Sequence, residues 1–484
     1  MRAQLIDQLI AISGENNVLT QGDLSAYLQD WRKWWEGRAV AIVRPKTTQE
    51  VALIVKACAQ ENVTIVPQGG NTGLVGGSIP DSSGTQVVIQ LGRMNSVVRI
   101  DKANMTVTVQ AGCVLASLQQ QAREAGFLFP LSLGAEGSCM IGGNLATNAG
   151  GTQVLRYGNT RDLCLGLEVV TPSGEVLNTL SGLRKDNTGY NLRDLFIGSE
   201  GTLGIITAAT LKLYPLPAAN ATSWAAVPDV DKAVELLGLA QNRLGSSLTG
   251  FELMCASGLH MVTKHLQQLR VPFSDDLPPY SILLECSGSE SADRTRSSLE
   301  SLLEEALQRD LISNVVVAET FEQSKQLWSI REHIPLAQVH EGPNVKHDIS
   351  LPISSIPEFL ARSASALCAA IPGVRIVNFG HLGDGNLHYN VLGPEGEDAK
   401  RFLADHEDQV TEIVYRTVAD FGGSFSAEHG VGAIKVHALE TYKCPCALDL
   451  MRSIKKAIDP HNLMNPGRVL AATSARPIQV PDSR

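Results

Sequence analysis

Short apolar runs and amphipathic stretches alternate along the first 215 residues, and each pattern predicts its own secondary structure. Runs rich in β-branched residues predict strands, whereas apolar side chains that recur every three or four residues predict helices. Residues 47–50 supply capping side chains for one of these helices. The sequence thus predicts helices at 1–10, 48–61 and 114–125, strands at 40–43, 64–66, 87–91, 97–100, 106–109 and 205–214, and a hairpin around 171–174. Such a mixture is typical of an α+β fold.

The pattern changes after Pro215-Leu216-Pro217, where two prolines in three residues end a strand and predict a boundary. Beyond it, the order strand, helix, strand occurs twice, at 222–227, 229–243 and 249–254, and again at 281–285, 291–310 and 314–317. Two β-α-β units in tandem predict a ferredoxin-like lobe. A helix-rich segment is expected from about 356, and the stretch after 472 lacks periodicity and is expected to be mobile.

Length and charge narrow the class of function. A chain of 484 residues is too long for one ordinary core, so two or three domains are expected. The net charge of −10 and the pI near 5.6 argue against binding to nucleic-acid backbones or anionic membranes. No stretch reaches the roughly 18 to 20 apolar residues of a spanning helix. The composition therefore favours chemistry on a small molecule.

The N-terminus and the cysteines indicate a compartment. Asp7 interrupts the first apolar stretch, which lacks the features of a secretory signal. The nine cysteines are odd in number and lie mostly in apolar surroundings, which favours reduced thiols inside a cell. We therefore expect a cytoplasmic protein, or an organelle-matrix protein in a eukaryote.

Two histidines flank an Asp-Gly pair in the segment from His381 to His388. Asp-Gly is a preferred centre of a two-residue type I′ hairpin, and such a turn at Asp384-Gly385 would place His381 directly opposite His388. Opposed residues hold their Cβ atoms about 4.5 to 5.5 Å apart, so both imidazoles could bind one divalent ion. Hairpin histidines that bind nothing are also common, and the motif alone does not decide between the two.

A second motif, Ser426-Ala427-Glu428-His429-Gly430, offers the missing ligand. The carboxylate of Glu428 would complete a His-His-Glu set that suits zinc, iron or manganese. Three protein ligands leave coordination positions open, as in catalytic sites. His429 would then be available as a base.

Three glycine-rich segments, at 67–77, 137–151 and 198–205, predict a binding surface for an extended cofactor. The first directly follows a predicted strand, where backbone amides can form an anion-binding nest. It lacks the lysine of a nucleotide-triphosphate loop and the spacing of a dinucleotide fingerprint, so neither is indicated. A merely tight glycine turn is the alternative.

These motifs, in this order, resemble the FAD-dependent 2-hydroxy-acid dehydrogenases of the vanillyl-alcohol oxidase superfamily. The resemblance spans nearly the whole chain and includes Asn465-Pro466-Gly467 near its end. It implies an α+β fold with an N-terminal helical segment (1–36), a PCMH-type FAD-binding domain of two α+β subdomains (37–216), a ferredoxin-like substrate-binding cap that carries the histidine motif (217–425), a helical C-terminal lobe (426–472) and the tail (473–484).

The resemblance also implies which residues hold FAD. The pyrophosphate contacts would come from Gly69, Gly70, Asn71, Thr72 and Gly73, and further contacts from Pro67, Ser138, Gly143, Asn144, Thr147, Gly151, Ile205 and Asn465. The first glycine loop contains no histidine or cysteine for covalent attachment, so non-covalent FAD is expected. Cys139 is expected to be a buried small residue.

For the substrate, the resemblance implies a divalent metal, zinc first, on His381, His388 and Glu428, with Arg331, Lys346 and Asn390 as substrate contacts. By itself, Arg331 would be read as a surface charge. Members that act on hydroxyglutarate carry a hydroxyl residue four places after this arginine, where the chain has Pro335. D-2-hydroxyglutarate is thus the first candidate substrate, and D-lactate and D-malate remain alternatives.

In the expected reaction, the metal lowers the pKa of the C2 hydroxyl, His429 takes its proton, and a hydride passes to flavin N5. An electron-transfer flavoprotein or a quinone would accept the electrons, and a homodimer is compatible with the family. The alternatives are an oxidase that uses oxygen, a non-catalytic flavin-binding subunit, and a metallohydrolase without flavin.

Overall fold

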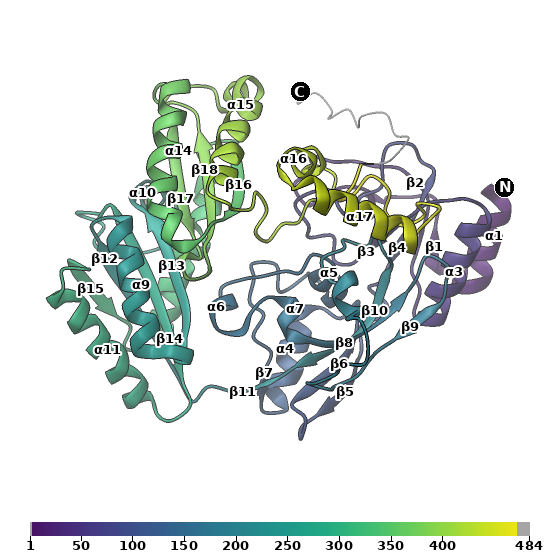
Figure 1. The fold of residues 1–484 in the computed structure, drawn as a ribbon, viewed down its shortest axis with the longest axis horizontal. Coiled ribbons are helices and arrows are strands. Elements are labelled where there is room, and N and C mark those ends of the chain that lie inside the picture. The colour runs from purple at the N-terminus through teal and green to yellow at the C-terminus, as the bar shows by residue number, and fades with distance from the viewer. Residues whose placement is uncertain (1, 472–484) are drawn as a thin grey trace. The chain divides into compact units, whose positions relative to one another are not determined.

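The computed structural model describes residues 2–471, and its chain divides into two compact units. Of the described residues, the first contains 2–151, 157–216 and 428–471, and the second contains 152–156 and 217–427. Figure 1 shows both units coloured along the chain. The tail expected to be mobile at 473–484 lies outside the described residues.

The first unit begins with a four-stranded sheet in the order β1-β2-β4-β3, in which β2, β4 and β3 run parallel. Thr47 caps α3 by accepting a hydrogen bond from the amide of Glu50, as its sequence predicts. The helix buries Val51, Ile54 and Val55 in the core of this unit. The elements of this part are α1 (Arg2–Ser13), β1 (Val18–Leu19), α2 (Ser25–Leu28), β2 (Ala39–Val43), α3 (Thr48–Gln60), β3 (Ile65–Gln68) and β4 (Gln86–Gln90).

A second, antiparallel sheet of the same unit has the order β5-β6-β10-β8-β9. The predicted strands at 97–100 and 106–109, the hairpin around 171–174 and the long strand from 205 are all present. The further elements of this unit are β5 (Val97–Asp101), β6 (Thr106–Gln110), α4 (Leu115–Glu124), β7 (Phe127–Leu128), α5 (Ile141–Ala146), α7 (Thr160–Leu163), β8 (Cys164–Val170), β9 (Val176–Asn178), α8 (Arg193–Phe196), β10 (Ile205–Lys212), β11 (Tyr214–Pro215), α16 (Val436–Tyr442) and α17 (Pro445–Ile458). The short helix α6 (Val154–Tyr157) lies mostly in the segment that belongs to the second unit.

The second unit is built on a seven-stranded sheet in the order β15-β12-β14-β13-β17-β18-β16. The strands β15, β12, β14 and β13 with helices α9 and α11 form the predicted ferredoxin-like arrangement, and β17, β18 and β16 extend it beyond what the sequence pattern predicts. The elements are β12 (Ala219–Val227), α9 (Val230–Leu244), β13 (Leu248–Cys255), α10 (Ala256–His265), β14 (Tyr280–Gly288), α11 (Ala292–Gln308), β15 (Asn314–Val317), α12 (Phe321–Glu332), α13 (Ile334–Val339), β16 (Val345–Ser350), α14 (Ile356–Ala370), β17 (Arg375–Gly380), β18 (Asn386–Leu392) and α15 (Ala399–Asp420).

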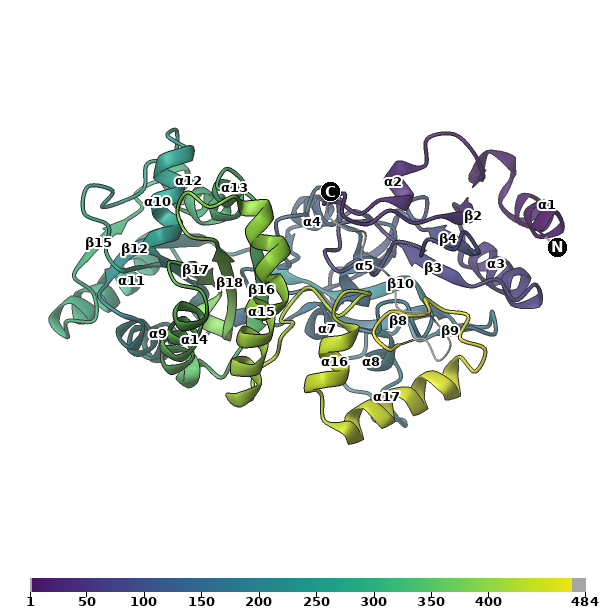
Figure 2. The ribbon, with the colours of Figure 1, turned by 90° about the horizontal axis from the view of Figure 1, so that it is seen from above.

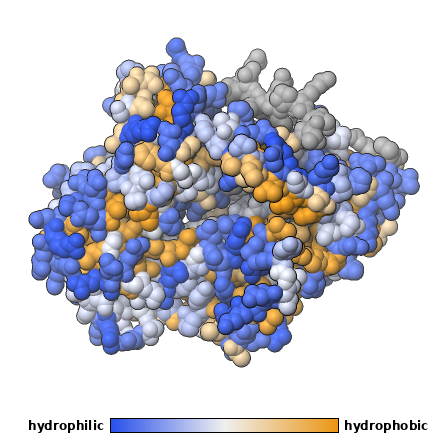
Figure 3. Space-filling model, viewed as in Figure 1, coloured by the Kyte–Doolittle hydropathy of each residue, from blue (hydrophilic) through white to orange (hydrophobic). Residues whose placement is uncertain are grey.

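Helices cover both faces of this sheet (Figure 2). On one face, α10, α12 and α13 share an apolar core with the strands, in which Met254 and Leu283 meet Ile330 and Ile334. On the other, α9 and α11 pack on β13 and β12, and α15 packs on β16. On the molecular face drawn in Figure 3, polar side chains surround separate apolar patches, in keeping with the acidic, charged composition.

The predicted two-residue hairpin at Asp384-Gly385 is wrong. Residues 381–385 form a longer connection that includes a 3-10 turn over Leu382–Asp384, and His388 pairs with Phe379 instead of with His381. The amide of Asn386 donates to the side chain of Asp384 and to the carbonyl of His381. This local bonding, together with the fit of Gly385 against the end of β16, selects the wider turn.

The predicted helix-rich segment from about 356 is present as α14, α15, α16 and α17, but β17 and β18 interrupt it. The histidine motif lies between two strands of the sheet, because the isoleucine and valine of β17 and β18 favour a pleated, half-buried surface.

Candidate functional site

Three side chains predicted to bind a metal lie together. One ligand atom each from His381, His388 and Glu428 falls within 4.8 Å of the others. The two imidazole centroids are 5.6 Å apart, and His381 is 7% exposed. His381 directly follows β17, His388 lies in β18, and Glu428 follows a segment that pairs with β16 through Ser424 and Ser350. The donor set fits a divalent ion with open coordination positions.

A buried carboxylate orients His381. Nδ1 of His381 is 2.7 Å from Oε1 of Glu252, so Nε2 is the ring nitrogen that would face an ion. The other oxygen of Glu252 accepts a hydrogen bond from Nε of Arg331, also at 2.7 Å. Burial favours the neutral acid, but the interactions with His381 and Arg331, which include a hydrogen bond from each, outweigh it and hold the pKa of Glu252 at about 2.

The expected substrate residues gather on one face of the same sheet. Lys346 is directly opposite Asn390, and residues two apart in a strand share a face, so both lie on the face of His388. Lys346 is exposed, whereas Asn390 is 4% exposed and donates to Oε1 of Gln338 at 2.9 Å.

Arg331 reaches this face from α12. It is 6% exposed, which overturns its reading as a surface charge, and its guanidinium lies over the ring of Phe379 at 5.0 Å. Phe379 in turn contacts the imidazole of His388, with centroids 5.0 Å apart. The structure thus brings a buried cation beside two of the candidate metal ligands.

The three glycine-rich segments meet in the first unit. A Cβ at Gly70 would overlap the carbonyl of Ser138, and one at Gly201 would come within 3.0 Å of Pro67. By contrast, a Cβ at Gly73 or Gly143 would meet no atom within 4 Å, which leaves their backbone open to a ligand. These contacts form a backbone-lined cradle from segments far apart in the sequence.

Two buried oxygens support a ligand in this cradle. Oδ1 of Asn144 and Oδ1 of Asn465 are among the buried side-chain atoms of the described residues that have no hydrogen-bond partner. Such orphaned groups are rare in folded proteins unless a ligand or water satisfies them. Both asparagines are among the expected FAD contacts, so the residues present fit the cofactor.

Other expected FAD residues have structural partners of their own. The side chain of Asn71 donates to the carbonyls of Ala26 and Gln29, so its backbone amide is the group left for a phosphate. Thr147 donates to the carbonyl of Gly143 within α5. The remaining positions lie at the end of β3 and beside it (Pro67, Gly69, Thr72), before α5 (Ser138), after it (Gly151) and at the start of β10 (Ile205). Cys139 is buried, as expected.

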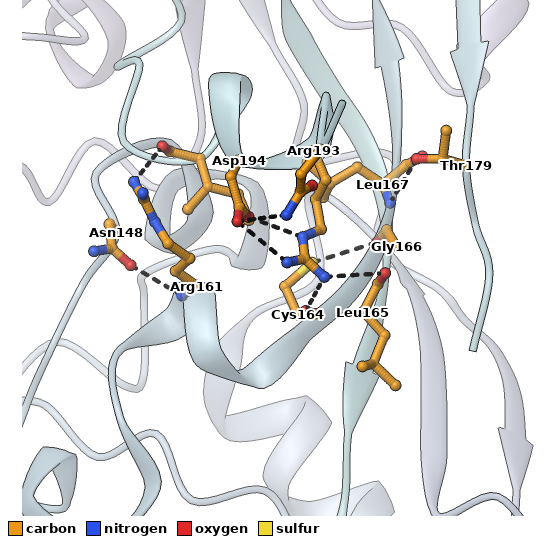
Figure 4. A network of polar contacts seen from close by, with 11 residues as sticks. Asn148, Arg161, Cys164, Leu165, Gly166, Leu167, Thr179, Arg193 and Asp194 are labelled. Carbon is orange, nitrogen blue, oxygen red and sulfur yellow. Dashed lines mark hydrogen bonds and ion pairs between the residues drawn. The ribbon is translucent and has the colours of Figure 1, made fainter. Parts of the chain in front are cut away.

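A polar network supports the segment that follows α5 (Figure 4). The amide of Arg161 donates to Oδ1 of Asn148 at 2.9 Å, and its guanidinium donates to the carbonyl of Ile197 at 2.8 Å. Arg193 donates to the carbonyl of Cys164 at 2.8 Å and forms an ion pair with Asp194. Arg161 thus ties Asn148 of the second glycine-rich segment to Ile197, the residue before the third, and Arg193 ties α8 to β8.

Glu200 is a buried carboxylate whose role the sequence analysis missed. Its oxygens accept hydrogen bonds from the amides of Val431 (2.7 Å) and Gly432 (2.8 Å), two and three residues after His429. Its carbonyl accepts the side chain of Asn465 at 2.9 Å. Burial raises the pKa of Glu200 above its ordinary value, against these amide bonds. The sequence offered one sign of this role, because Glu200 lies inside a glycine-rich segment. A charged side chain that is buried there needs a specific hydrogen-bond partner.

We expect Glu200→Ala to lower the free energy of unfolding by about 1–3 kcal/mol, because two buried amides lose their acceptor. Denaturant titration of the flavin-loaded protein measures the change. Glu175→Ala, at an exposed position of the same unit, should stay within about 0.5 kcal/mol of the parent. Equal losses in the two variants would contradict a specific role of Glu200.

No helix among residues 2–471 combines the length and apolar character needed to span a bilayer. Two family models match the chain. "FAD linked oxidases, C-terminal domain" covers residues 216–469, and "FAD binding domain" covers residues 39–180.

Named relatives match over nearly the whole chain. It is 41% identical over 441 residues to the mitochondrial D-2-hydroxyglutarate dehydrogenase of Danio rerio, covering 91% of this chain and 80% of that protein. It is 38% identical over 459 residues to the D-2-hydroxyglutarate dehydrogenase of Xanthomonas citri pv. viticola, covering 95% of each.

Solved structures share the fold at lower identity. p-Cresol methylhydroxylase with bound substrate aligns with a TM-score of 0.74 at 17% identity over 98% of both chains. Alkyldihydroxyacetonephosphate synthase aligns with a TM-score of 0.71 at 20% identity over 96% of this chain and 85% of the other.

Proposed function

Because the chain belongs to the family of FAD-linked oxidases, we propose that it is a dehydrogenase that oxidises a D-2-hydroxy acid to the 2-oxo acid, with D-2-hydroxyglutarate as its first substrate. The observation that carries the proposal is the buried link from Arg331 through Glu252 to His381, which joins a carboxylate-binding cation to a candidate metal site. The names of the relatives support the choice of substrate.

The cradle at 67–77, 138–151 and 198–205, with Asn465, would hold FAD without a covalent bond. Bound FAD would supply the acceptor for the hydride that leaves C2. The amides of the first loop would meet the pyrophosphate, because backbone N–H groups in a nest favour negative charge.

His381, His388 and Glu428 would hold a divalent ion, with zinc first among zinc, iron and manganese. The ion would supply positive charge that favours ionisation of the C2 hydroxyl. The terminal nitrogens of Arg331 would grip a substrate carboxylate in a fork, and Lys346 and Asn390 are the further contacts proposed on the same face.

His429 would take the proton from the C2 hydroxyl oxygen. It follows the ligand Glu428 in the chain and is half-buried, and Glu200 holds the turn that comes after it. An imidazole has an ordinary pKa of about 6.5, which suits a base near neutral pH. One proton to His429 and one hydride from C2 account for the conversion of alcohol to ketone.

Pro335 is the feature that favours a second candidate substrate. It opens α13 and carries no hydroxyl to bind the distal carboxylate of hydroxyglutarate. D-Lactate, which has no second carboxylate, and D-malate, which has a shorter chain, are therefore alternatives.

Anaerobic mixing with a panel of D- and L-2-hydroxy acids tests the proposal, with bleaching of the flavin absorbance as the measurement. We expect D-acids to bleach the flavin and L-acids to fail, with D-2-hydroxyglutarate fastest. Faster bleaching by D-lactate or D-malate would move the substrate to that acid. Failure of every D-acid would overturn the proposed activity.

The physiological acceptor we propose is an electron-transfer flavoprotein or a quinone. Turnover in air should reduce an added dye with little release of peroxide. Stoichiometric peroxide without dye would instead make the protein an oxidase.

A further inference from the structure

The carboxylate of Glu252 bonds both to a candidate metal ligand, His381, and to the candidate substrate cation, Arg331. Its side chain is 1% exposed and lies in β13, which is flanked by β14 and β17 in the sheet. Each oxygen has its own partner, Oε1 at His381 and Oε2 at Arg331. The partners lie 129 and 79 residues away in the sequence.

We propose that Glu252 is a positioning residue that sets the metal-binding tautomer of His381 and the plane of the Arg331 guanidinium at the same time. The inference about Arg331 rests on the proposed function, whereas the inference about His381 requires only that a metal binds. Neither step needs Glu252 to touch substrate or metal.

The tautomer follows from the hydrogen bond. A carboxylate can only accept, so Nδ1 of His381 must carry the hydrogen, and Nε2 keeps the lone pair that a metal needs. A glutamine at this position would present an amide NH₂ to one of its two partners. If it faced His381, Nδ1 would have to accept, and the hydrogen would move to Nε2, where it blocks coordination. If the NH₂ group faced Arg331, it would meet the Nε–H of the guanidinium, and neither group could accept a hydrogen bond from the other.

The plane of Arg331 is fixed from two sides. Glu252 accepts a hydrogen bond from Nε of Arg331, and the ring centroid of Phe379 lies 5.0 Å from the central carbon of the guanidinium. A guanidinium held at Nε and on one face has its terminal nitrogens in a defined direction, which a bidentate contact to a carboxylate requires. The negative charge of Glu252 also lies between Arg331 and His381, so it would offset repulsion between Arg331 and a divalent ion held at His381.

Glu285 provides a matched control. It lies in the neighbouring strand β14, is 7% exposed, and accepts the indole N–H of Trp328 at 2.8 Å. Trp328 precedes Arg331 by three residues in α12, so both side chains lie on the same face of this helix. Glu285 bonds to the first of them and Glu252 to the second. Glu285→Gln therefore changes a buried carboxylate of the same sheet whose hydrogen-bond partners include Trp328 and Thr222.

The experiment measures two affinities in the flavin-loaded full chain. The first is the affinity for Zn²⁺ alone, by competition with a chromogenic chelator. The second is the affinity of the metal-stripped protein for 2-oxoglutarate, by perturbation of the flavin spectrum. We expect Glu252→Gln to lower the affinity on the side that its amide NH₂ faces: the Zn²⁺ affinity, about 10- to 100-fold, if it faces His381, and 2-oxoglutarate binding if it faces Arg331. Arg331→Met should lower only the second affinity, and Glu285→Gln should change neither.

Glu252→Asp is the second variant, in case the glutamine protein does not fold. Its carboxylate is one methylene shorter and reaches one partner only, so one of the two affinities should fall and the other should stay near that of the parent. The proposal is overturned if the Glu252 variant that folds has both affinities within about twofold of the parent. It is also overturned if Glu285→Gln lowers the two affinities as much as the Glu252 variant does. In another outcome, the parent protein fails to bind 2-oxoglutarate while the Glu252 variant still loses Zn²⁺ affinity. That result would support the role of Glu252 at His381 and would refute the proposed substrate class.

Discussion

Replacing His429 with asparagine should slow flavin reduction by the hydroxy acid about 10²- to 10⁴-fold, while bound FAD stays in place. Asparagine fills a similar space but cannot take up a proton, so the C2 hydroxyl loses its acceptor. His429→Ala should show a loss in the same range. Rapid mixing under anaerobic conditions, with the flavin absorbance as the signal, measures the rate directly.

His437 provides the control for this substitution. It is exposed in α16, eight residues after His429, and His437→Asn should reduce at the rate of the parent. The rate of the parent should also rise with pH as an imidazole-like group loses its proton, because a base must be neutral to accept one. That dependence should disappear in His429→Asn. Reduction of the His429 variants at the parental rate would remove this residue from the chemistry.

The sequence predicted the sheet and helix segments of both units well, because their periods are local properties of the chain. The cap at Thr47, the strand-helix-strand repeat after Pro217 and the strand from Ile205 each follow from a few neighbouring residues. β16 was missed, since Lys346, His347 and Asp348 dilute its apolar alternation and only the pairing with β18 makes it a strand.

His381, His388 and Glu428 lie together as predicted, although the local structure predicted around the two histidines is wrong. His381 and His388 converge although the turn between them is five residues long and their predicted pairing does not exist. The turn is decided by the side chain of Asp384 and by packing against Leu351, and the second of these is not a local property.

Glu252 could not be assigned from the sequence because both of its partners are distant. A charged residue within the apolar strand 249–254 signals that something must compensate its burial, but the pattern does not say what. Only the fold supplies Arg331 and His381. The same holds for Glu200, whose partners lie more than 200 residues further along the chain.

Removal of the metal should lower turnover of the hydroxy acid by at least about 100-fold, and added Zn²⁺ should restore it. A divalent ion contributes several kcal/mol to stabilising developing negative charge, and 1.36 kcal/mol corresponds to a factor of ten in rate. Exhaustive chelation followed by dye reduction measures the loss, and the flavin spectrum confirms that FAD remains bound. Mn²⁺ and Fe²⁺ in place of Zn²⁺ would show which ion supports the highest rate.

Variants distinguish this site from chance binding of metal elsewhere. His388→Ala should be as inactive as the chelated protein and should not recover with Zn²⁺, because the set is reduced to two ligands. His260→Ala, at an exposed position of α10, should lose and regain activity exactly as the parent does under chelation and add-back. Full activity in the metal-free parent would mean that His381, His388 and Glu428 hold no catalytic ion. The ionisation of the hydroxyl would then rest on His429 and Arg331 alone.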